Sequence, residues 1–240
     1  MATTITGNTI DVGTNVIVTD SAGNVGIGTS SPTRKLTVYD TDAYLALQNP
    51  TTGSAAGDGF QLQLVGNDVY HANYEAGSQI FTTSGSEAMR INSAGIVTKP
   101  LQPAFLATKT TTSSNMAIDV NNLISYDSER FDIGSNFASS IFTAPVTGKY
   151  HLTANVRLDQ VDTAATFYQL KIVTSNVTYS QIHSMKYTAD PSYWSICFSI
   201  FADMDINDTA LVYVKQTDGT AQTDIDGNPN YNNFSGYLVC

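Results

Sequence analysis

The strongest strand signal in the sequence starts in the segment Phe142-Thr-Ala-Pro-Val-Thr-Gly-Lys-Tyr150 and continues through His-Leu-Thr-Ala-Asn-Val-Arg-Leu158. From Tyr150 onward apolar and polar residues alternate, which is the period-2 pattern of a half-buried strand. Pro145 and Gly148 predict a turn ahead of it. We therefore expect a short strand that ends near Thr143, a tight reversal, and a long strand that carries the alternating pattern.

The composition indicates a folded chain with few charges. Of the 240 residues 42% are hydrophobic, which is enough for the core of one large all-β domain or of two smaller ones. Only 13% of the residues are charged, while 10% are aromatic and 13 of these are Tyr. A polar surface with few charges suits contact with sugars better than contact with an ionic partner.

Charge and hydropathy argue against nucleic-acid binding and membrane insertion. The net charge is -10, and the 11 Lys and Arg residues are scattered, whereas binding to phosphates requires clustered basic side chains. No signal peptide and no apolar run near the ~20 residues of a membrane span is present, so we expect a chain made in the cytoplasm. The two cysteines form no disulfide framework, and we expect Cys197 to be a buried free thiol.

The first hundred residues predict short strands separated by glycine-rich turns. Residues 1 to about 20 predict one or two short strands, or an arm that orders on a partner. The later strands are too short and too lightly apolar to bury much, so a single copy is marginal in water and we expect packing against identical chains. These predicted strands are Tyr44–Gln48, Phe60–Val65, Val69–Tyr74, Gln79–Thr83 and Ala88–Ile91.

One turn sequence occurs twice. Ile91-Asn-Ser-Ala-Gly-Ile-Val97 repeats the pattern of Thr19-Asp-Ser-Ala-Gly-Asn-Val25, so we expect the same hairpin at both places. The glycines near the first copy do not predict a phosphate cradle, because no helix pattern and no Walker-type Gly-Lys-Ser/Thr follows them.

Two segments carry a resemblance to a known group of proteins. Gly23-Asn-Val-Gly-Ile-Gly-Thr-Ser-Ser-Pro32 with Lys35-Leu-Thr-Val38, and Glu87-Ala-Met-Arg-Ile-Asn-Ser-Ala-Gly95, resemble the shaft and neck segments of bacteriophage tail-fibre and related appendage proteins. The resemblance covers about residues 18–100 and implies a trimeric segment. The self-cleaving chaperone domain that follows in many relatives has no counterpart here, which leaves open how trimerisation is directed.

The second half predicts a two-layer β domain. Lys99-Pro-Leu-Gln-Pro103 predicts a stiff junction, because each proline removes a donor and restrains its predecessor. Eight or nine longer strands with turns between them predict a two-sheet sandwich or jelly roll. We expect alternate residues of Trp194–Ile200 to share one face, and the last strand to lie centrally because it is apolar on both sides. The predicted strands are Ala104–Lys109, Leu123–Tyr126, Ile141–Thr143, Lys149–Leu158, Phe167–Thr174, Val177–Ser184, Trp194–Ala202, Ala210–Gln216 and Phe234–Val239.

This half also carries a resemblance, through Pro103-Ala-Phe105, Ile124, Tyr126-Asp127, Phe131-Asp132, Gly134, Asn136-Phe137, Phe142-Thr-Ala-Pro145, Gly148, Tyr150 and Phe234-Ser-Gly-Tyr-Leu238. In order and spacing these residues resemble the globular domain of the C1q and tumour-necrosis-factor superfamily. The resemblance implies a ten-stranded jelly roll that assembles as a compact homotrimer with loops free for recognition. The long polar loop Thr217–Asn233 departs from the family pattern.

No residue set predicts catalysis or zinc binding. His71, His151 and His183 lie in strand-like runs without a nucleophile elbow, so we interpret them as ordinary surface or interface histidines. Two distant cysteines and single histidines do not have the spacing of zinc ligands.

The loop Thr217–Asn233 is the candidate site. One interpretation is calcium, which C1q-like trimers often bind near their apex; the other is a plain turn loop, because the third acidic position and the terminal Glu of an EF-hand are missing. Exposed tyrosines beside Asn and Asp also suit a saccharide surface. The calcium candidates are Asp218, Asp224 and Asp226, with Asn228 and Asn230 beside them; the predicted recognition residues are Asp224, Asp226, Asn228, Tyr231, Asn232 and Asn233; the further loop or strand tyrosines are Tyr168, Tyr179, Tyr187 and Tyr193.

We therefore predict an all-β, homotrimeric, non-enzymatic tail-fibre protein of a phage virion. Residues 1–40 form a virion-attachment arm or β-hairpin region that binds other virion proteins, residues 41–101 a β-rich trimeric shaft or neck, and residues 102–240 a C1q/TNF-like jelly-roll head. The head binds a polysaccharide or protein of the host surface, with a glycan preferred. The alternatives are a structural capsid, neck or collar decoration protein without a receptor role, and a depolymerase.

Overall fold

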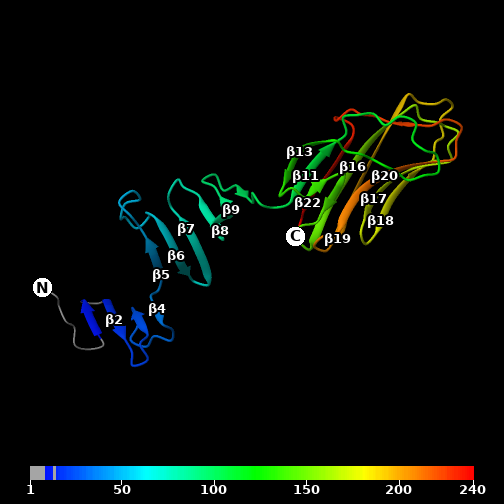
Figure 1. The fold of residues 1–240 in the computed structure, drawn as a ribbon. Helices are drawn as coiled ribbons and strands as arrows, with labels where there is room; N and C mark the ends of the chain where they lie inside the picture. Colours follow the sequence, from blue (N-terminus) through cyan, green and yellow to red (C-terminus); the bar gives the residue numbers. More distant parts are fainter. Residues whose placement is uncertain (1–8, 13–14) are drawn as a thin grey trace. The chain divides into compact units, whose positions relative to one another are not determined.

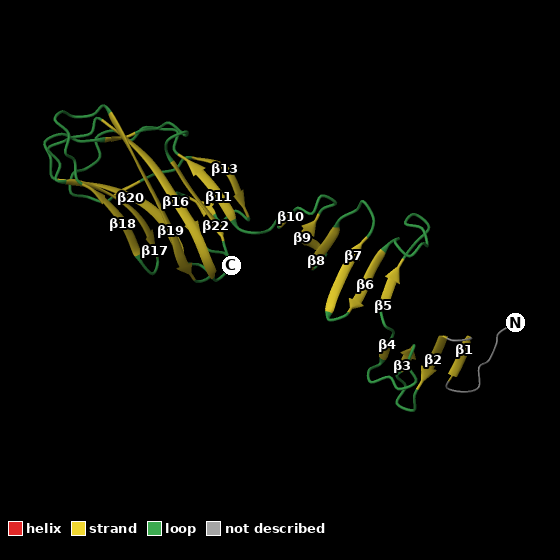
Figure 2. Ribbon diagram, turned by 180° about the vertical axis from the view of Figure 1, so that it is seen from behind, coloured by secondary structure: helices red, strands yellow, loops and turns green. Residues whose placement is uncertain are grey.

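The computed structural model describes residues 9–12 and 15–240, and the chain divides into two compact units, Met1–Thr98 and Lys99–Cys240. We call them the N-terminal unit and the head. The described residues form strands and loops without a helix (Figure 2), so the all-β prediction is confirmed and no membrane-spanning helix occurs among them. Residues 1–8 and 13–14 of the predicted attachment arm lie outside the described residues. The division falls at the predicted Lys99–Pro103 junction, three residues before the predicted head.

The N-terminal unit contains three small sheets (Figure 1). The first has four strands in chain order, of which the last two are parallel. The other two are antiparallel three-stranded sheets, β5-β6-β7 and β10-β9-β8. The strands are β1 (Thr9–Val12), β2 (Asn15–Thr19), β3 (Val25–Ile27), β4 (Leu36–Val38), β5 (Ala43–Leu47), β6 (Phe60–Val65), β7 (Asp68–Asn73), β8 (Gln79–Thr83), β9 (Ser86–Ile91) and β10 (Val97–Thr98).

The repeated turn has the same structure in both copies. In the first copy the Asp20 carboxylate accepts hydrogen bonds from the backbone N–H groups of Ala22 and Asn24, each at 2.9 Å. In the second copy the Asn92 side-chain oxygen accepts the equivalent bonds from Ala94 and Ile96, also at 2.9 Å. Gly23 and Gly95 both adopt positive φ, 71° and 78°, which glycine tolerates without steric strain. The predicted recurrence of this hairpin is confirmed.

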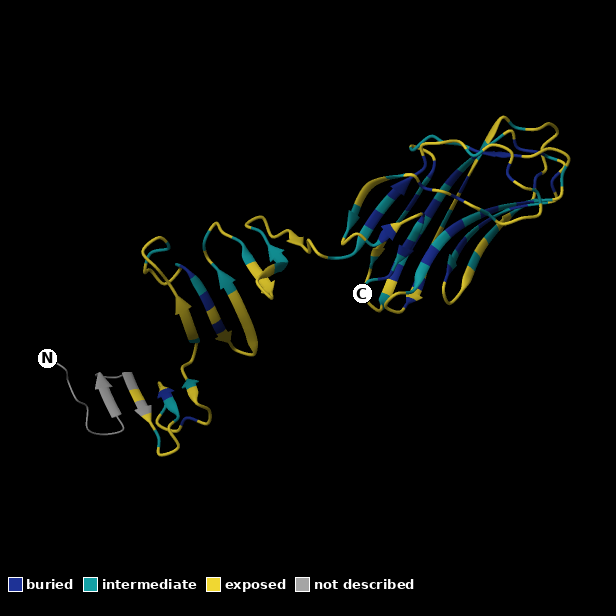
Figure 3. Cartoon of the chain, in the orientation of Figure 1, coloured by how far each residue is buried: buried dark blue, intermediate teal, exposed yellow. Residues whose placement is uncertain are grey.

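The described part of the N-terminal unit lacks a hydrophobic core of its own. Among its residues with described burial, Pro32 is the one apolar side chain that is buried, and each sheet has large apolar residues that are exposed. Figure 3 shows that most of the described part of this unit is exposed or intermediate. On β5-β6-β7 the register places five of them on one face, which we call the leucine face. It consists of Leu45, Leu47, Leu62, Leu64 and Val69, which are 36% to 68% exposed.

The head contains β11 (Ala104–Thr108), β12 (Asn122–Leu123), β13 (Ser128–Ile133), β14 (Phe137–Ala138), β15 (Ile141–Thr143), β16 (Gly148–Asp159), β17 (Phe167–Thr174), β18 (Thr178–His183), β19 (Tyr193–Met204), β20 (Thr209–Thr217), β21 (Asp224–Ile225) and β22 (Asn233–Leu238). One sheet has the order β13-β11-β22-β16-β19, with β21 on β16; we call it the β16 sheet. The other has the order β14-β15-β20-β17-β18, with β12 on β20. Eight of these strands, numbered one to eight in chain order, form the jelly roll: β11, β15, β16, β17, β18, β19, β20 and β22. The β16 sheet holds the first, eighth, third and sixth of them, and the other sheet holds the second, seventh, fourth and fifth. This order is a jelly roll, as predicted.

The segment before β16 is a crossover rather than a hairpin. β15 pairs with β14 and β20, whereas β16 pairs with β19, β21 and β22 in the opposite sheet. The expected tight reversal is therefore wrong, because the chain has to change layers for both strands to keep their apolar side chains in the core. Tyr150 secures the crossing: its ring lies 5.4 Å from that of Phe142, and its hydroxyl donates to Val146 O at 2.7 Å.

Four of the aromatic residues quoted for the second resemblance meet in one core cluster, whereas Phe131 and Tyr237 are exposed. The Phe105 ring lies 4.6 Å from Phe142, 5.1 Å from Phe137 and 5.0 Å from Phe234. Gly236 makes room for them, since a Cβ there would lie 2.8 Å from the Phe105 ring. Residues that are 129 apart in sequence thus occupy one site because the first and last strands of the head are neighbours.

Two strand predictions are confirmed and two expectations are wrong. Alternate residues of Trp194–Ile200 share the inner face of β19, and β22 lies between β11 and β16. Cys197 is exposed rather than buried, because it falls on the outer face of β19. The predicted strand Leu123–Tyr126 is paired only at Asn122–Leu123; beyond it Ile124 and Tyr126 enter the core from a loop.

Candidate functional site

The structure turns part of the predicted recognition loop inward. Asp224 is 8% exposed; its carboxylate accepts hydrogen bonds from Asn115 N at 2.7 Å and from Gln160 Nε2 at 3.1 Å. It therefore ties together three segments of the head. A partner cannot contact this side chain without displacing those bonds.

Asn232 is fully buried and holds the loop in shape. Its side-chain oxygen accepts from Arg157 N at 2.8 Å, and its amide donates to Asp226 Oδ2 and Asn228 O, both at 3.2 Å. The prediction that Asp224 and Asn232 contact a ligand at the surface is therefore wrong. Both side chains are buried because they satisfy backbone groups that the loop would otherwise leave unpaired. Four predicted recognition residues are exposed or partly exposed: Asp226, Asn228, Tyr231 and Asn233.

Two of these residues, Asp226 and Tyr231, interact with a basic side chain, Arg157, that the sequence analysis did not single out. The Arg157 guanidinium carbon lies 4.8 Å from the centroid of the Tyr193 ring and 5.1 Å from that of Tyr231. Arg157 Nε donates to Asp159 Oδ1 at 2.8 Å. Although desolvation lowers the pKa of Arg157, the hydrogen bond and charge of Asp159, with the charge of Asp226, raise it above the ordinary value. We call Arg157, Asp159, Tyr193, Asp226 and Tyr231 the Arg157 cluster.

The sequence analysis predicted the two tyrosines and Asp226 of this cluster, but not Arg157 or Asp159. Tyr193 and Tyr231 were grouped as tyrosines in or beside loops, and both are exposed, at 64% and 46%. Tyr168 of the same group is instead buried, with its hydroxyl 2.6 Å from Thr223 Oγ1. Arg157 was recognisable only as one polar position of β16, since β16, β19 and the loop meet there only in the folded head.

The three calcium candidates do not form one site. Asp218 Oδ2 accepts from Thr166 Oγ1 at 2.7 Å, Asp224 binds Asn115 and Gln160, and Asp226 Oδ2 accepts from Asn228 N at 3.1 Å. No group of three or more His, Cys, Asp or Glu side chains suited to a metal occurs in residues 9–12 and 15–240. The three carboxylates thus bond to different groups, Asp224 from β21 and the other two from loops.

The histidines make ring contacts. His151 lies 4.9 Å from the Phe201 ring and 5.4 Å from Tyr237, and His183 lies 5.1 Å from Trp194. Within the described residues no imidazole hydrogen-bonds a hydroxyl or thiol. We call His151, Phe201 and Tyr237 the Phe201 cluster; Phe201 is 67% and Tyr237 48% exposed on the outer face of the β16 sheet.

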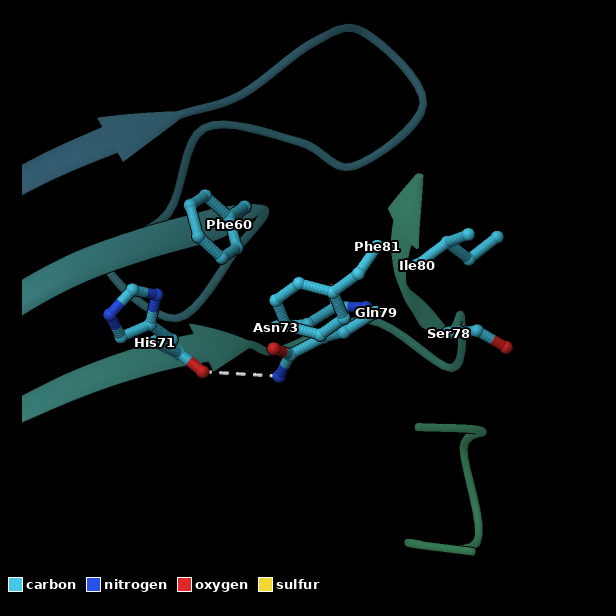
Figure 4. Close-up of a pocket in the computed structure, with 7 residues that line it drawn as sticks. All are labelled: Phe60, His71, Asn73, Ser78, Gln79, Ile80 and Phe81. Atoms are coloured by element: carbon cyan, nitrogen blue, oxygen red, sulfur yellow. Dashed lines mark hydrogen bonds between the residues drawn. The ribbon is translucent and has the colours of Figure 1, made fainter. Parts of the chain in front are cut away.

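A pocket of about 310 Å³ in the N-terminal unit is lined by residues of β6, β7 and the β8 region (Figure 4). Phe60 and His71 lie on one side and Phe81 faces them, while Gln79 Nε2 donates to His71 O at 3.1 Å. Ser78 lies away from the imidazole, and its hydroxyl accepts from Arg90 at 3.3 Å. The Ser and His of this pocket are therefore not arranged as a nucleophile and its base.

No protein-family model matches the sequence, and no curated protein matches it. Solved structures give a likeness. The globular domain of zebrafish complement 1qA is similar over 58% of this chain and 98% of its own, with 13% identity and a TM-score of 0.43. Murine APRIL, in a crystal structure at pH 8.0, is similar over 57% of this chain and 99% of its own, with 13% identity and a TM-score of 0.43. At these values the likeness says nothing of ligands or partners, and the jelly roll is established by the strand order of the head itself.

Proposed function

We propose that this chain is a non-enzymatic, homotrimeric tail-fibre protein of a phage virion whose jelly-roll head binds a glycan of the host surface. The observation that carries the proposal is the contrast in burial between the two units. The head has 27 buried hydrophobic residues, beginning at Phe105, whereas the described part of the N-terminal unit has only Pro32 buried among its apolar side chains.

The leucine face is the clearest sign of association. A three-stranded sheet with an exposed apolar face is marginal in water, because it leaves unburied the surface whose removal from water stabilises folding. Contiguous exposed apolar surface of this kind marks an interaction site. Identical copies are the simplest partner, because each presents the same apolar sheets with few charges. Three copies are supported by the resemblance of both halves to trimeric proteins.

The head contributes a second contact surface and a recognition surface. The Phe201 cluster is apolar and exposed near the start of β16, which suits contact between copies. The Arg157 cluster stands six residues further along β16, about 20 Å away. It combines two aromatic rings with one Arg and two Asp side chains, which suits a saccharide. Three weak sites on one trimer sum to firm adhesion.

The test is the mass of the full chain in solution, by sedimentation at micromolar concentration. We expect three times the 25.7 kDa chain mass. Leu45→Asp combined with Leu62→Asp places two carboxylates on the leucine face. Packing that face against another copy would then bury unpaired charges, which is costly, so we expect the trimer to dissociate. Val120→Asp, at a 51% exposed position in a head loop, is the matched control and should leave the mass unchanged.

A monomeric wild-type chain would refute the proposal. The glycan part is tested with the same preparation, by binding to host cells before and after enzymatic removal of their surface polysaccharide. Release of reducing sugar from that polysaccharide would favour the depolymerase instead.

A second candidate is a structural decoration protein of the capsid, neck or collar. The inward position of Asp224 and Asn232 favours it, since a third of the predicted recognition residues serves the loop itself. A trimer that binds virions lacking this protein but binds no host cell would support this candidate.

A further inference from the structure

The Arg157 cluster places one guanidinium against two exposed aromatic rings. Each ring has the guanidinium over one side, at 4.8 Å for Tyr193 and 5.1 Å for Tyr231. The guanidinium is itself held by Asp159. Both residues are also exposed, Tyr193 at 64% and Tyr231 at 46%, so each keeps surface that a ligand can contact. Rings fixed before binding lose little conformational entropy when a ligand packs on them.

Unused hydrogen-bonding atoms occur on the cluster and on two residues beside it, Asn228, which bonds Asp226, and Asn233 of β22, which pairs with Asn155 of β16. Among the described residues no partner occurs for Arg157 Nη1, Asp226 Oδ1, Asn228 Nδ2 or Asn233 Nδ2, although the other polar atoms of these side chains are bonded. The set contains three donors and one acceptor. A ligand rich in hydroxyl groups, each both donor and acceptor, matches such a mixed set.

The charge of the cluster selects among such ligands. One guanidinium faces the carboxylates of Asp159 and Asp226, so the cluster is net negative, on a chain of net charge -10. A carboxylated or sulfated sugar would be repelled and would compete with Asp159 for the only cation. A neutral pyranose has no such conflict, and the C–H groups on one side of its ring form an apolar face that packs on an aromatic ring.

We infer that the Arg157 cluster is the binding site for a neutral sugar, a hexose or N-acetylhexosamine unit, which stacks on the ring of Tyr193 or Tyr231 and hydrogen-bonds the free groups of Asp226, Asn228 and Asn233. The inference rests on the proposed glycan-binding function and deepens it. It moves the site from the interior of the loop to the junction of β16, β19 and the loop.

The experiment uses the full chain on an array of immobilised glycans that end either in neutral hexoses and N-acetylhexosamines or in sialic and uronic acids. We expect binding to a subset of the neutral glycans and none to their acidic counterparts. Tyr193→Ala and Tyr231→Ala should each reduce binding by about tenfold or more, while Tyr193→Phe, which keeps the ring, should retain it. Tyr187→Ala is the matched control: Tyr187 is 54% exposed and makes no ring contact with Arg157.

The outcomes separate this inference from the proposed function. Binding that is confined to acidic glycans, or that is unchanged in Tyr193→Ala and Tyr231→Ala, overturns the inference and leaves glycan binding intact. Binding to no glycan overturns both. Sedimentation of each variant completes the test: if the alanine variants lose the trimer, the cluster belongs to an interface between copies and the inference fails.

Discussion

At the residue scale, single buried polar side chains hold the loops of the head in place. Asp162 is 2% exposed, and its carboxylate accepts backbone hydrogen bonds from Ala164 at 2.8 Å and Ala221 at 2.7 Å, and another from Thr220. It therefore ties the β16–β17 loop to the start of the predicted recognition loop. Burial alone would raise the pKa of Asp162, but these backbone N–H groups hold it below its ordinary value.

We expect Asp162→Ala to lower the free energy of unfolding of the head by about 1.5–3 kcal/mol, because it leaves three part-buried N–H groups without their charged acceptor. Denaturant titration followed by Trp194 fluorescence measures this, since Trp194 is the only tryptophan. Asp203→Ala removes an exposed carboxylate paired with Lys149 and should cost less than about 1 kcal/mol. Equal losses in both variants would contradict the assigned role.

The lowered pKa of Asp162 also predicts how the stability of the head changes with pH. Because its pKa is lower in the folded state than the ~3.9 of an unfolded Asp, its contribution is fully present above about pH 5 and is lost as the pH falls toward the folded pKa. The wild type should therefore lose more stability than Asp162→Ala between about pH 5 and pH 3. Parallel losses in the two proteins would refute this.

At the element scale, the alternating pattern of the sequence predicted the bounds of the regular strands. Phe60–Val65, Gln79–Thr83, Ile141–Thr143 and Phe167–Thr174 have the predicted bounds. Charged and very short strands such as β13, β14 and β21 were missed, because their pairing partners, and not their own sequences, make them strands. β21 is an example: Asp224 and Ile225 pair with the end of β16, and Ile225 also pairs with Ser113.

The repeated turn gives a prediction at this scale. Asp20→Ala and Asn92→Ala each remove two side-chain hydrogen bonds to the backbone of their own turn, and each such bond is worth about 1 kcal/mol. Amide hydrogen exchange should accelerate about tenfold or more at Ala94 and Ile96 in Asn92→Ala, and at Ala22 and Asn24 in Asp20→Ala, without affecting the other turn. Ser21→Ala is the control, because its hydroxyl makes no hydrogen bond among the described residues.

At the scale of the whole molecule, the two units depend on different sources of stability. The head carries its own core, whereas the N-terminal unit exposes its apolar side chains. We therefore expect the fragment 99–240 to fold and to unfold cooperatively when followed by Trp194 fluorescence, and the fragment 1–98 to lack protected amides when diluted to a monomer. A stably folded, monomeric 1–98 would refute the dependence on association.

The sequence alone determined the features that depend on local patterns. These are the all-β class, the alternating strands, the recurring Asp/Asn-Ser-Ala-Gly turn and the two-layer head. The tertiary structure alone decided which polar side chains are free. Asp224 and Asn232 looked like recognition residues and are buried, while Arg157 looked like one polar position of a strand and lies over Tyr193 and Tyr231. The physical reason is that a side chain's surroundings depend on strands distant in sequence, which periodicity along one strand does not encode.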